Sequence, residues 1–217
     1  MARRHAWLTY SGLAIMAVIG SAVASAQSPT APARGIDTWN GLGSGLGDEV
    51  RAVAAVGGEV YLGGAFTDAG GLTGADHIVR WDGTSWHALG QGLNGTVNAI
   101  AVVGSHVYAG GFFADAGGEP YADNIARWDG TAWNPLGSGL NNAVRDLAPA
   151  GDDLYVVGDF TATGGGGGLS HVARWDGTGW SAVGSGVNAP VSAAEVVGAD
   201  LYVGGAFLDA GGLDEAD

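Results

Sequence analysis

Short runs rich in Val, Ile, Tyr, Phe and Trp alternate along the chain with turns rich in Gly, Asp and Asn. Runs of four to eight such residues between turn formers are typical of β-strands, and no stretch shows the 3.6-residue period of a helix. In one unit the runs predict four strands, over residues 97–103, 106–112, 124–128 and 132–136. The pattern therefore predicts an all-β fold of four-stranded units.

The units recur with a fixed period of 47 residues. Arg-Trp-Asp-Gly-Thr occurs three times, with its tryptophan at Trp81, Trp128 and Trp175. Other aromatic residues keep the same step in four copies: Trp39, Trp86, Trp133 and Trp180; Tyr61, Tyr108, Tyr155 and Tyr202; Phe66, Phe113, Phe160 and Phe207. A period of this size indicates a solenoid, a propeller or an array rather than one ordinary core.

The first strand of the unit, residues 97–103, is apolar on both faces. An antiparallel strand with one wet face would alternate apolar and polar residues, so we expect both faces of the sheet to be covered. A four-stranded antiparallel sheet covered on both sides and repeated at fixed length predicts the blade of a β-propeller, or of an open propeller arc. A β-solenoid is the alternative, but tight reversing hairpins do not suit its coils.

Two kinds of tight turn join the strands. The first and second strands of each unit meet at Gly57-Gly58, Gly104-Ser105, Gly151-Asp152 and Gly198-Ala199, and the third and fourth meet at Asp82-Gly83, Asp129-Gly130 and Asp176-Gly177. Two-residue turns of these types are preferred in hairpins because they accept positive φ. With Asp82-Gly83 as the whole loop, Trp81 faces Thr84 and Val79 faces Trp86, so the two indoles are diagonal neighbours.

The first 35 residues predict export and a leader before the repeats at 36–217. Arg3 and Arg4 precede an apolar run at 13–23, and Ala24-Ser25-Ala26 fits a cleavage site before Gln27. The alternative is an uncleaved anchor, although the run is short for a membrane span of about 20 residues. We expect a signal peptide at 1–26, a flexible leader at 27–35 and a secreted, cell-surface or periplasmic product that does not insert into the membrane after cleavage.

Composition narrows the classes of function. The chain has no cysteine, which excludes disulfides, thiol nucleophiles and thiolate metal sites. After residue 26 six arginines stand against 22 acidic residues, a formal charge of −16. Such a charge argues against nucleic acid or an anionic membrane as partners.

The unit Ile-Ala-Arg-Trp-Asp-Gly-Thr-x-Trp-x-x-Leu-Gly-Ser-Gly-Leu-Asn, followed by Leu-Tyr-Val-Gly-Gly-x-Phe, resembles the repeats of kelch-like propellers. It is more similar to secreted repeats grouped with the fungal cortical cell-polarity marker, and the likeness covers residues 36–217. The resemblance implies an extracellular propeller without known catalytic residues. The third copy departs from the pattern at Pro149 and at 164–168, five consecutive glycines, and Pro149 is expected to break its strand locally.

Residues present in every copy are interpreted as scaffold, and Arg80, Arg127 and Arg174 as structural ion pairs or aromatic stacks. Binding is expected where the copies differ. Strand directions place the two longer loops of each unit on one face and the tight turns on the other. Five residues near the longer loops do not recur in every copy and are candidates for ligand binding: Glu119, Tyr121, Arg145, Asp146 and Asp159.

Two pairs of carboxylates flank glycine-rich loops: Asp68 with Asp76, and Asp115 with Asp123. Each pair could form turns, or it could contribute to a calcium site, since calcium takes six to eight oxygen ligands. The third copy has Ala162 and Ser170 instead, so we expect its loop to bind no metal and to be mobile. No other cofactor is predicted.

No set of residues resembles a catalytic site, so the sequence favours a non-catalytic module that binds a protein or a polysaccharide at the cell surface. A secreted hydrolase or lyase, and a structural spacer within a larger surface protein, are the alternatives. The last unit is incomplete at Asp217, which predicts a gene fragment or one segment of a larger ring.

Overall fold

The computed structural model describes residue 42 and residues 45–211. The predicted signal peptide, the leader, Trp39 and Asp217 lie outside this part. We call each sheet a blade. The first blade holds β1 (Val50–Val56), β2 (Glu59–Gly64), β3 (Ile78–Trp81) and β4 (Trp86–Ala88). The second holds β5 (Thr96–Val103), β6 (His106–Phe112), β7 (Ile125–Trp128) and β8 (Trp133–Pro135).

The third blade holds β9 (Val144–Ala150), β10 (Asp153–Gly158), β11 (Val172–Trp175) and β12 (Trp180–Ala182). The fourth has two strands in the described part, β13 (Val191–Val197) and β14 (Asp200–Gly205). All neighbouring strands are antiparallel. The all-β prediction is confirmed, and the strands of the second blade match the predicted ranges to within one residue at each end.

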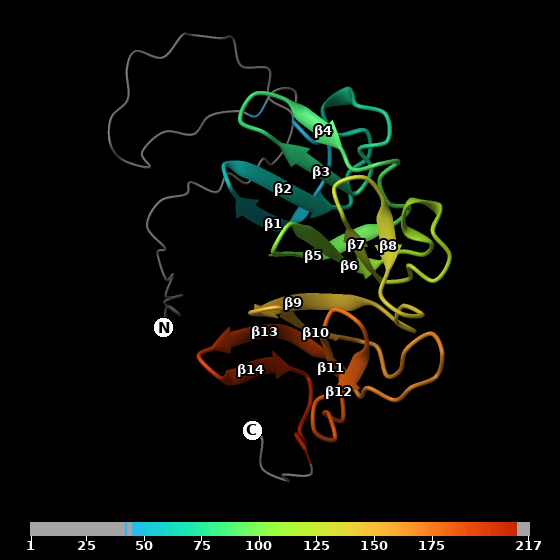
Figure 1. Ribbon diagram of the computed structural model, residues 1–217, viewed down its shortest axis with the longest axis vertical. Coiled ribbons are helices and arrows are strands. Elements are labelled where there is room, and N and C mark those ends of the chain that lie inside the picture. Colours follow the sequence, from blue (N-terminus) through green and yellow to red (C-terminus); the bar gives the residue numbers. More distant parts are fainter. Residues whose placement is uncertain (1–41, 43–44, 212–217) are drawn as a thin grey trace, which may run out of the picture.

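The four blades follow one another along an arc, and β4, β8 and β12 lie on its outer side (Figure 1). The first strands of neighbouring blades touch one another, β1 with β5, β5 with β9 and β9 with β13. The arrangement is propeller-like, with the first strand of each blade innermost, and antiparallel blades replace the coils that a solenoid would need.

The turns between first and second strands form as predicted. Val56 pairs with Glu59 across Gly57-Gly58, which have φ of 58° and 87°. Positive φ at both central residues gives the turn that matches the twist of the strands. The other three blades repeat this register.

The predicted register of the second hairpin is wrong by one pair. Trp81 directly faces Trp86, so the turn is centred on Gly83 and Thr84 rather than on Asp82-Gly83. The side chain of Asp82 explains the shift: its Oδ1 accepts the backbone N–H groups of Thr84 and Ser85, both at 2.8 Å, and the Thr84 hydroxyl at 2.7 Å. Asp129 and Asp176 do the same in the next blades.

This turn brings the paired indoles into contact. The ring centroids of Trp81 and Trp86 lie 4.8 Å apart in an edge-on arrangement, and the other two pairs are tilted at 5.5 and 5.1 Å. Aromatic pairs at this separation add about 0.5–1.5 kcal/mol to the free energy gained from burial. The aspartates stay charged while they hold the turn, since the donated hydrogen bonds lower the pKa of Asp82, led by His87, and of Asp129, led by the N–H of Ala132.

Between blades, glycine on one sheet accommodates large side chains on the next. A Cβ on Gly63 would lie 2.5 Å from Val97 Cγ1, and one on Gly110 would lie 2.4 Å from Val144 Cγ1. Val97 and Val144 are fully buried. At such distances a side chain cannot be added without movement of its neighbours, so each glycine sets how closely two blades approach.

Pro149 does not break β9, contrary to the prediction. It pairs with Leu154 inside a continuous strand. β9 is the edge strand of its blade, and Pro149 lies one pair beyond Ala150 and Asp153, which flank the two-residue turn. Because a turn-flanking pair is hydrogen-bonded and the next pair is not, the nitrogen of Pro149 points to the open edge, where no donor is required.

Candidate functional site

The two longer loops of each blade lie on one face, as predicted. The loop between second and third strands contains a short 3-10 turn, η1 (Ala69–Gly71) or η2 (Ala116–Gly118). It is joined to the loop that leads into the next blade, because Leu93 N–H donates to Asp76 O at 3.0 Å and Leu140 N–H donates to Asp123 O at 3.1 Å. This loop face is more elaborate than the opposite face, which carries only tight turns.

Tyr121 combines an exposed side chain with an uncommon backbone conformation. Its side chain is 66% exposed, and its φ is 70°, in the left-handed region. The same position in the first blade is Gly74, with φ of 80°, and in the third it is Gly168. A bulky residue rarely adopts positive φ because its Cβ crowds the backbone. The second blade therefore places tyrosine where its neighbours use glycine.

Glu119 lies two residues earlier in the same loop, directly after η2. Its side chain is exposed, and its backbone closes the turn, since its N–H donates to Ala116 O at 3.0 Å and its carbonyl accepts the N–H of Ala122 at 3.2 Å. The backbone of Glu119 thus stabilises the turn, and its carboxylate extends from a backbone that these hydrogen bonds fix.

The structure pairs Arg145 with Asp159, two of the other predicted binding residues. Arg145 Nε donates to Asp159 Oδ1 at 2.7 Å and its Nη2 donates to Oδ2 at 3.1 Å. Hydrogen bonding to Asp159 raises the pKa of Arg145 above its ordinary value. This fork joins the start of β9 to the residue after β10 within one blade, so both side chains already have a structural partner.

Asp146 connects the third and fourth blades. Its Oδ2 accepts the backbone N–H of Ala194 in β13 at 2.9 Å, and its Oδ1 accepts the N–H of Leu147 at 2.9 Å. Of the five residues predicted to bind a ligand, Glu119 and Tyr121 therefore present exposed side chains two residues apart in one loop, whereas the other three are engaged in the scaffold.

Phe112 was missed by the sequence analysis. It ends β6, immediately before the loop that carries Tyr121, and it is 67% exposed. The corresponding residues of the other blades are Ala65, Asp159 and Ala206. The signal was available in the sequence, because a large apolar residue stands where the other copies have a small or charged one. Alternation had placed it only as the last residue of a strand.

The carboxylate pairs hold their loops through the backbone. Asp76 Oδ1 accepts the N–H of Asp68 at 2.8 Å, and Asp123 Oδ1 accepts the N–H of Asp115 at 2.9 Å. Asp68 and Asp115 have φ of 47° and 46°, which turns the chain sharply. Among the described residues no three acidic or histidine side chains gather as a metal site would require. These contacts favour the turn interpretation, and calcium binding stays a prediction.

In the third blade Ser170 stands where Asp76 and Asp123 stand in the first two, and other contacts hold the loop. Gly164 N–H donates to Gly139 O at 3.0 Å and Gly165 N–H donates to Ser138 Oγ at 2.7 Å. Asn141 Oδ1 also accepts the N–H groups of Thr161 and Ala162. These bonds fasten the glycine-rich loop to the preceding one, which argues against the mobility that its composition predicted.

Two of the three repeated arginines form the predicted ion pairs. Arg80 pairs with Glu59, and Arg174 Nη2 lies 2.7 Å from Asp153 Oδ2. At the corresponding position the second blade has His106, and the buried Nε of Arg127 has no hydrogen-bond partner among the described residues. The second blade therefore lacks the acid that the first and third blades provide.

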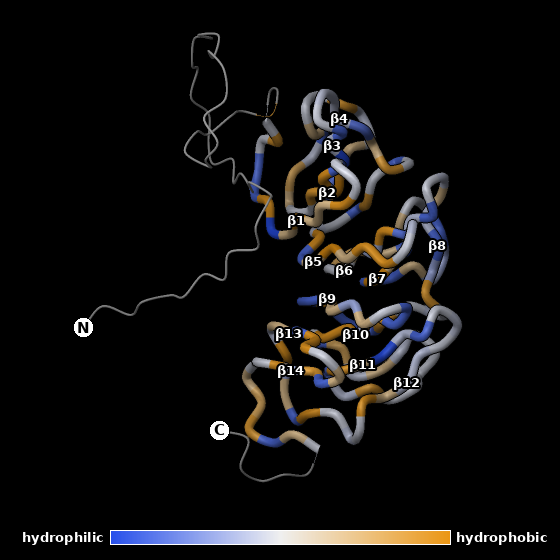
Figure 2. The backbone as a smooth tube through the Cα atoms, turned by 60° about the vertical axis from the view of Figure 1, so that its left-hand side comes forward, coloured by the Kyte–Doolittle hydropathy of each residue, from blue (hydrophilic) through white to orange (hydrophobic). Residues whose placement is uncertain are grey.

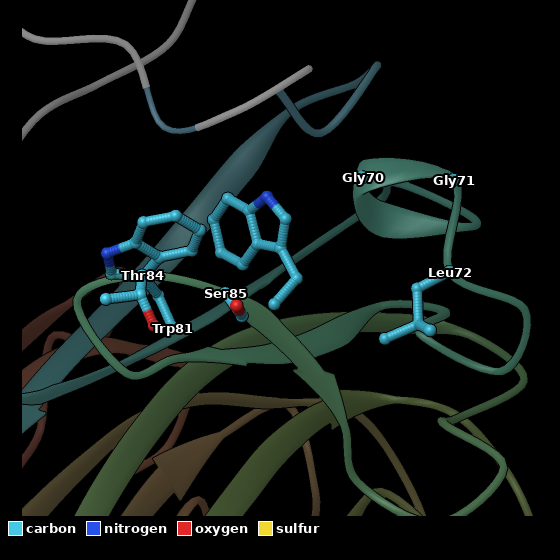
Figure 3. A pocket seen from close by; sticks show the side chains of 7 residues that line it. Gly70, Gly71, Leu72, Trp81, Thr84 and Ser85 are labelled. Carbon is cyan, nitrogen blue, oxygen red and sulfur yellow. The ribbon is translucent and has the colours of Figure 1, made fainter.

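A hollow of about 390 Å³ lies on the outer part of the first blade, between the η1 turn and the β3–β4 hairpin (Figure 3). Trp81, Trp86, Thr84 and Ser85 line it together with residues 70–72. In the next blades Gly90 and Gly137 lie beside the equivalent indoles, since a Cβ on either would contact a ring, and Trp133 Nε1 donates to Leu89 O at 3.0 Å. The first-blade counterparts of that loop, residues 43–44, lie outside the described part.

Comparisons with known proteins show a similarity in fold only. No protein-family profile matches the chain, and no curated protein matches it. The crystal structure of the computationally designed Ika4 protein is similar, with a TM-score of 0.52 and 16% identity over 75% of this chain and 89% of that chain. The designed Ika8 protein is similar with a TM-score of 0.50 and 17% identity over 75% of this chain and 44% of that chain.

These likenesses agree with the propeller-like, all-β arrangement. The resemblance to kelch-like and cell-polarity-marker repeats stays a prediction, since no family matches. In the part of the chain that the structure describes, no helix has the length and apolar character needed to cross a membrane.

Proposed function

We propose that this chain is a secreted or cell-surface β-propeller module of kelch-like type that binds a protein or a polysaccharide without catalysis. Its ligand is bound on the loop face of the second blade by Tyr121 and Phe112, with Glu119 beside Tyr121. The observation that carries the proposal is Tyr121, an exposed aromatic residue in a left-handed conformation that glycine occupies in the first blade.

The left-handed conformation of Tyr121 costs free energy, and the exposed side chain does little to offset it. A non-glycine residue in the left-handed region costs on the order of 1–3 kcal/mol, and an exposed ring gains little from burial. Gly74 shows that the loop of the first blade forms without a side chain at this position. Strain that the fold does not need points to a contact made outside the fold.

The chemistry of this surface suits a ligand with both apolar and polar groups. Phe112 and Tyr121 are each about two-thirds exposed, and aromatic rings offer flat apolar area, to which tyrosine adds a hydroxyl. Tyrosine is also enriched among residues that dominate binding energy in protein interfaces. The carboxylate of Glu119 accepts hydrogen bonds, which favours neutral or cationic groups over polyanions.

The proposal is tested by screening the purified chain on a glycan array and on an array of surface proteins, and then measuring the strongest binder with two variants. Tyr121→Gly should weaken binding at least about tenfold, since loss of an aromatic anchor costs about 2 kcal/mol or more. The same change should leave the melting temperature unchanged or raise it, because glycine relieves the positive φ. Phe112→Ala should weaken binding in the same assay.

Leu208→Ala is the matched control, because Leu208 is 69% exposed on the fourth blade and its loss should not alter binding. A Tyr121→Gly variant that melts lower and binds as before would show that Tyr121 is structural. The absence of any binder on both arrays would also count against the proposal.

A further inference from the structure

One interface is repeated between neighbouring blades, and it has two sides. Each end of the arc carries one of these sides, and it is less buried there than between blades. Each internal interface joins the sheet of one blade to the first strand of the next. At the first interface Gly63 faces Val97 and Ile100, and at the second Gly110 faces Val144 and Leu147. At the third interface Val157 stands on the first side, and Val191 and Ala194 stand on the second. We call these sides the rear face and the front face of a blade.

The rear face of the fourth blade carries the residues of the first two blades, Tyr and Gly, but no described residue covers it. Gly204 occupies the position of Gly63 and Gly110, and a Cβ placed on it would meet nothing within 4 Å. Tyr202 is 58% exposed, whereas its equivalents Tyr61 and Tyr108 are 8% and 5% exposed. Figure 2 shows hydrophobic residues on β13 and β14 at this end of the arc.

The front face of the first blade is the matching surface. Val50 and Val53 stand at the positions of Val97 and Ile100. Val97, Val144 and Val191 are fully buried, but Val50 is only partly buried. The first and last blades lie at opposite ends of the arc in both views (Figures 1 and 2).

The residue sizes on the two open faces are complementary. Glycine meets two large side chains at the first two internal interfaces, and Gly204 against Val50 and Val53 of another copy restores that combination. At the third interface the sizes are exchanged: Val157 stands at the glycine position, and the small Ala194 packs against the same hydrophobic cluster. A fourth blade with valine at position 204 would not fit Val50 and Val53, whereas the glycine that is present does.

We propose that the rear face of the fourth blade binds the front face of the first blade of a second copy of this chain, head to tail. The contact repeats the interface that already joins the blades within one chain. A head-to-tail contact of this kind closes into a ring when the rotation between copies allows it. The contact is independent of the ligand surface proposed on the second blade.

Sedimentation of the purified chain over a range of concentrations tests the proposal. The chain should form dimers or larger closed assemblies, and Gly204→Val should weaken this association about tenfold or more, because the added methyl groups clash with Val50 and Val53 of the neighbour. Within one chain no described residue lies within 4 Å of a Cβ at position 204, so the variant should keep its circular dichroism spectrum.

The third interface of the chain suggests a second substitution that should restore association. Val53→Ala in the Gly204→Val background copies the Val157–Ala194 pair and should restore association, whereas Val53→Ala alone should weaken it only slightly. A chain that stays monomeric at every concentration would overturn the proposal. Association that Gly204→Val leaves unchanged would overturn it as well, since the contact would then lie elsewhere.

Discussion

The second and third blades share one sheet but build it with different residues. Both have the same strand pairing and the same two tight hairpins. At the rear face the second blade has Gly110 and the third has Val157. The larger side chain of Val157 is matched by Ala194 on the following blade, where Ile100 and Leu147 stand at the earlier interfaces.

This difference shows that the repeat preserves the total side-chain volume at an interface rather than any single residue. The three carbon atoms that valine adds to one sheet are offset by the three that alanine lacks, relative to leucine or isoleucine, on the next, as close packing requires. The polar differences follow another rule. Where the second blade has His106 instead of an acid, the buried Nε of Arg127 has no hydrogen-bond partner among the described residues, so the loss of this ion pair is not offset in the way that the change in volume is.

The largest expected effect comes from making the second blade like the third at one position only. Gly110→Val should destabilise the chain by about 3 kcal/mol, because a Cβ there would lie 2.4 Å from Val144 Cγ1 and 3.5 Å from Leu147 Cδ2. Urea unfolding followed by tryptophan fluorescence measures the change. Gly204→Val is the control at the equivalent open position, and equal destabilisation by both variants would contradict this account of the interfaces.

A smaller effect is expected at the unpaired arginine. His106→Asp should stabilise the second blade by about 1 kcal/mol, because it offers the buried Nε of Arg127 the acceptor that Asp153 gives Arg174. The pairs in the other blades are partly exposed, which keeps the gain at the upper end of surface ion pairs. His106→Ala is the control, and the same stability for both variants would mean that the charge is not needed.

The smallest expected effect is on the stability of the fold at low pH. The hydroxyl and N–H of Thr178 and the N–H of Gly179 lower the pKa of Asp176 from 3.8 to about 2. Since the pKa is lower in the folded chain, the turn's contribution is complete above about pH 4 and is lost as the pH falls through 2. Asp176→Asn should therefore reduce the loss of stability between pH 4 and 2, measured by urea unfolding. An unchanged acid dependence would show that the turn does not depend on this charge.

The repeat predicted the strands because alternation and turn residues report backbone geometry directly. It failed at the second hairpin, where the side chain of Asp82 accepts hydrogen bonds from the turn and moves its centre by one residue, a choice that turn statistics do not show. Pro149 was misjudged because the sequence could not tell which side of the strand is open.

The candidate site was predicted in part. Glu119 and Tyr121 were identified because non-repeated residues on long loops tend to be functional, but the same rule selected Arg145, Asp146 and Asp159, which stabilise the scaffold. Whether an unrepeated charge has a partner depends on contacts between strands and between blades, such as that of Asp146 with Ala194. The left-handed conformation of Tyr121 became evident only with the backbone in place.

The most direct test of the claim that blades exchange volume across their interfaces is a double-mutant cycle at Gly110 and Leu147. Leu147→Ala creates at the second interface the small residue that Ala194 provides at the third. We expect each single variant to be destabilised and the double variant to recover at least about 1 kcal/mol relative to the sum of the two. Strictly additive losses would contradict the claim and would mean that each interface is fixed by its own residues.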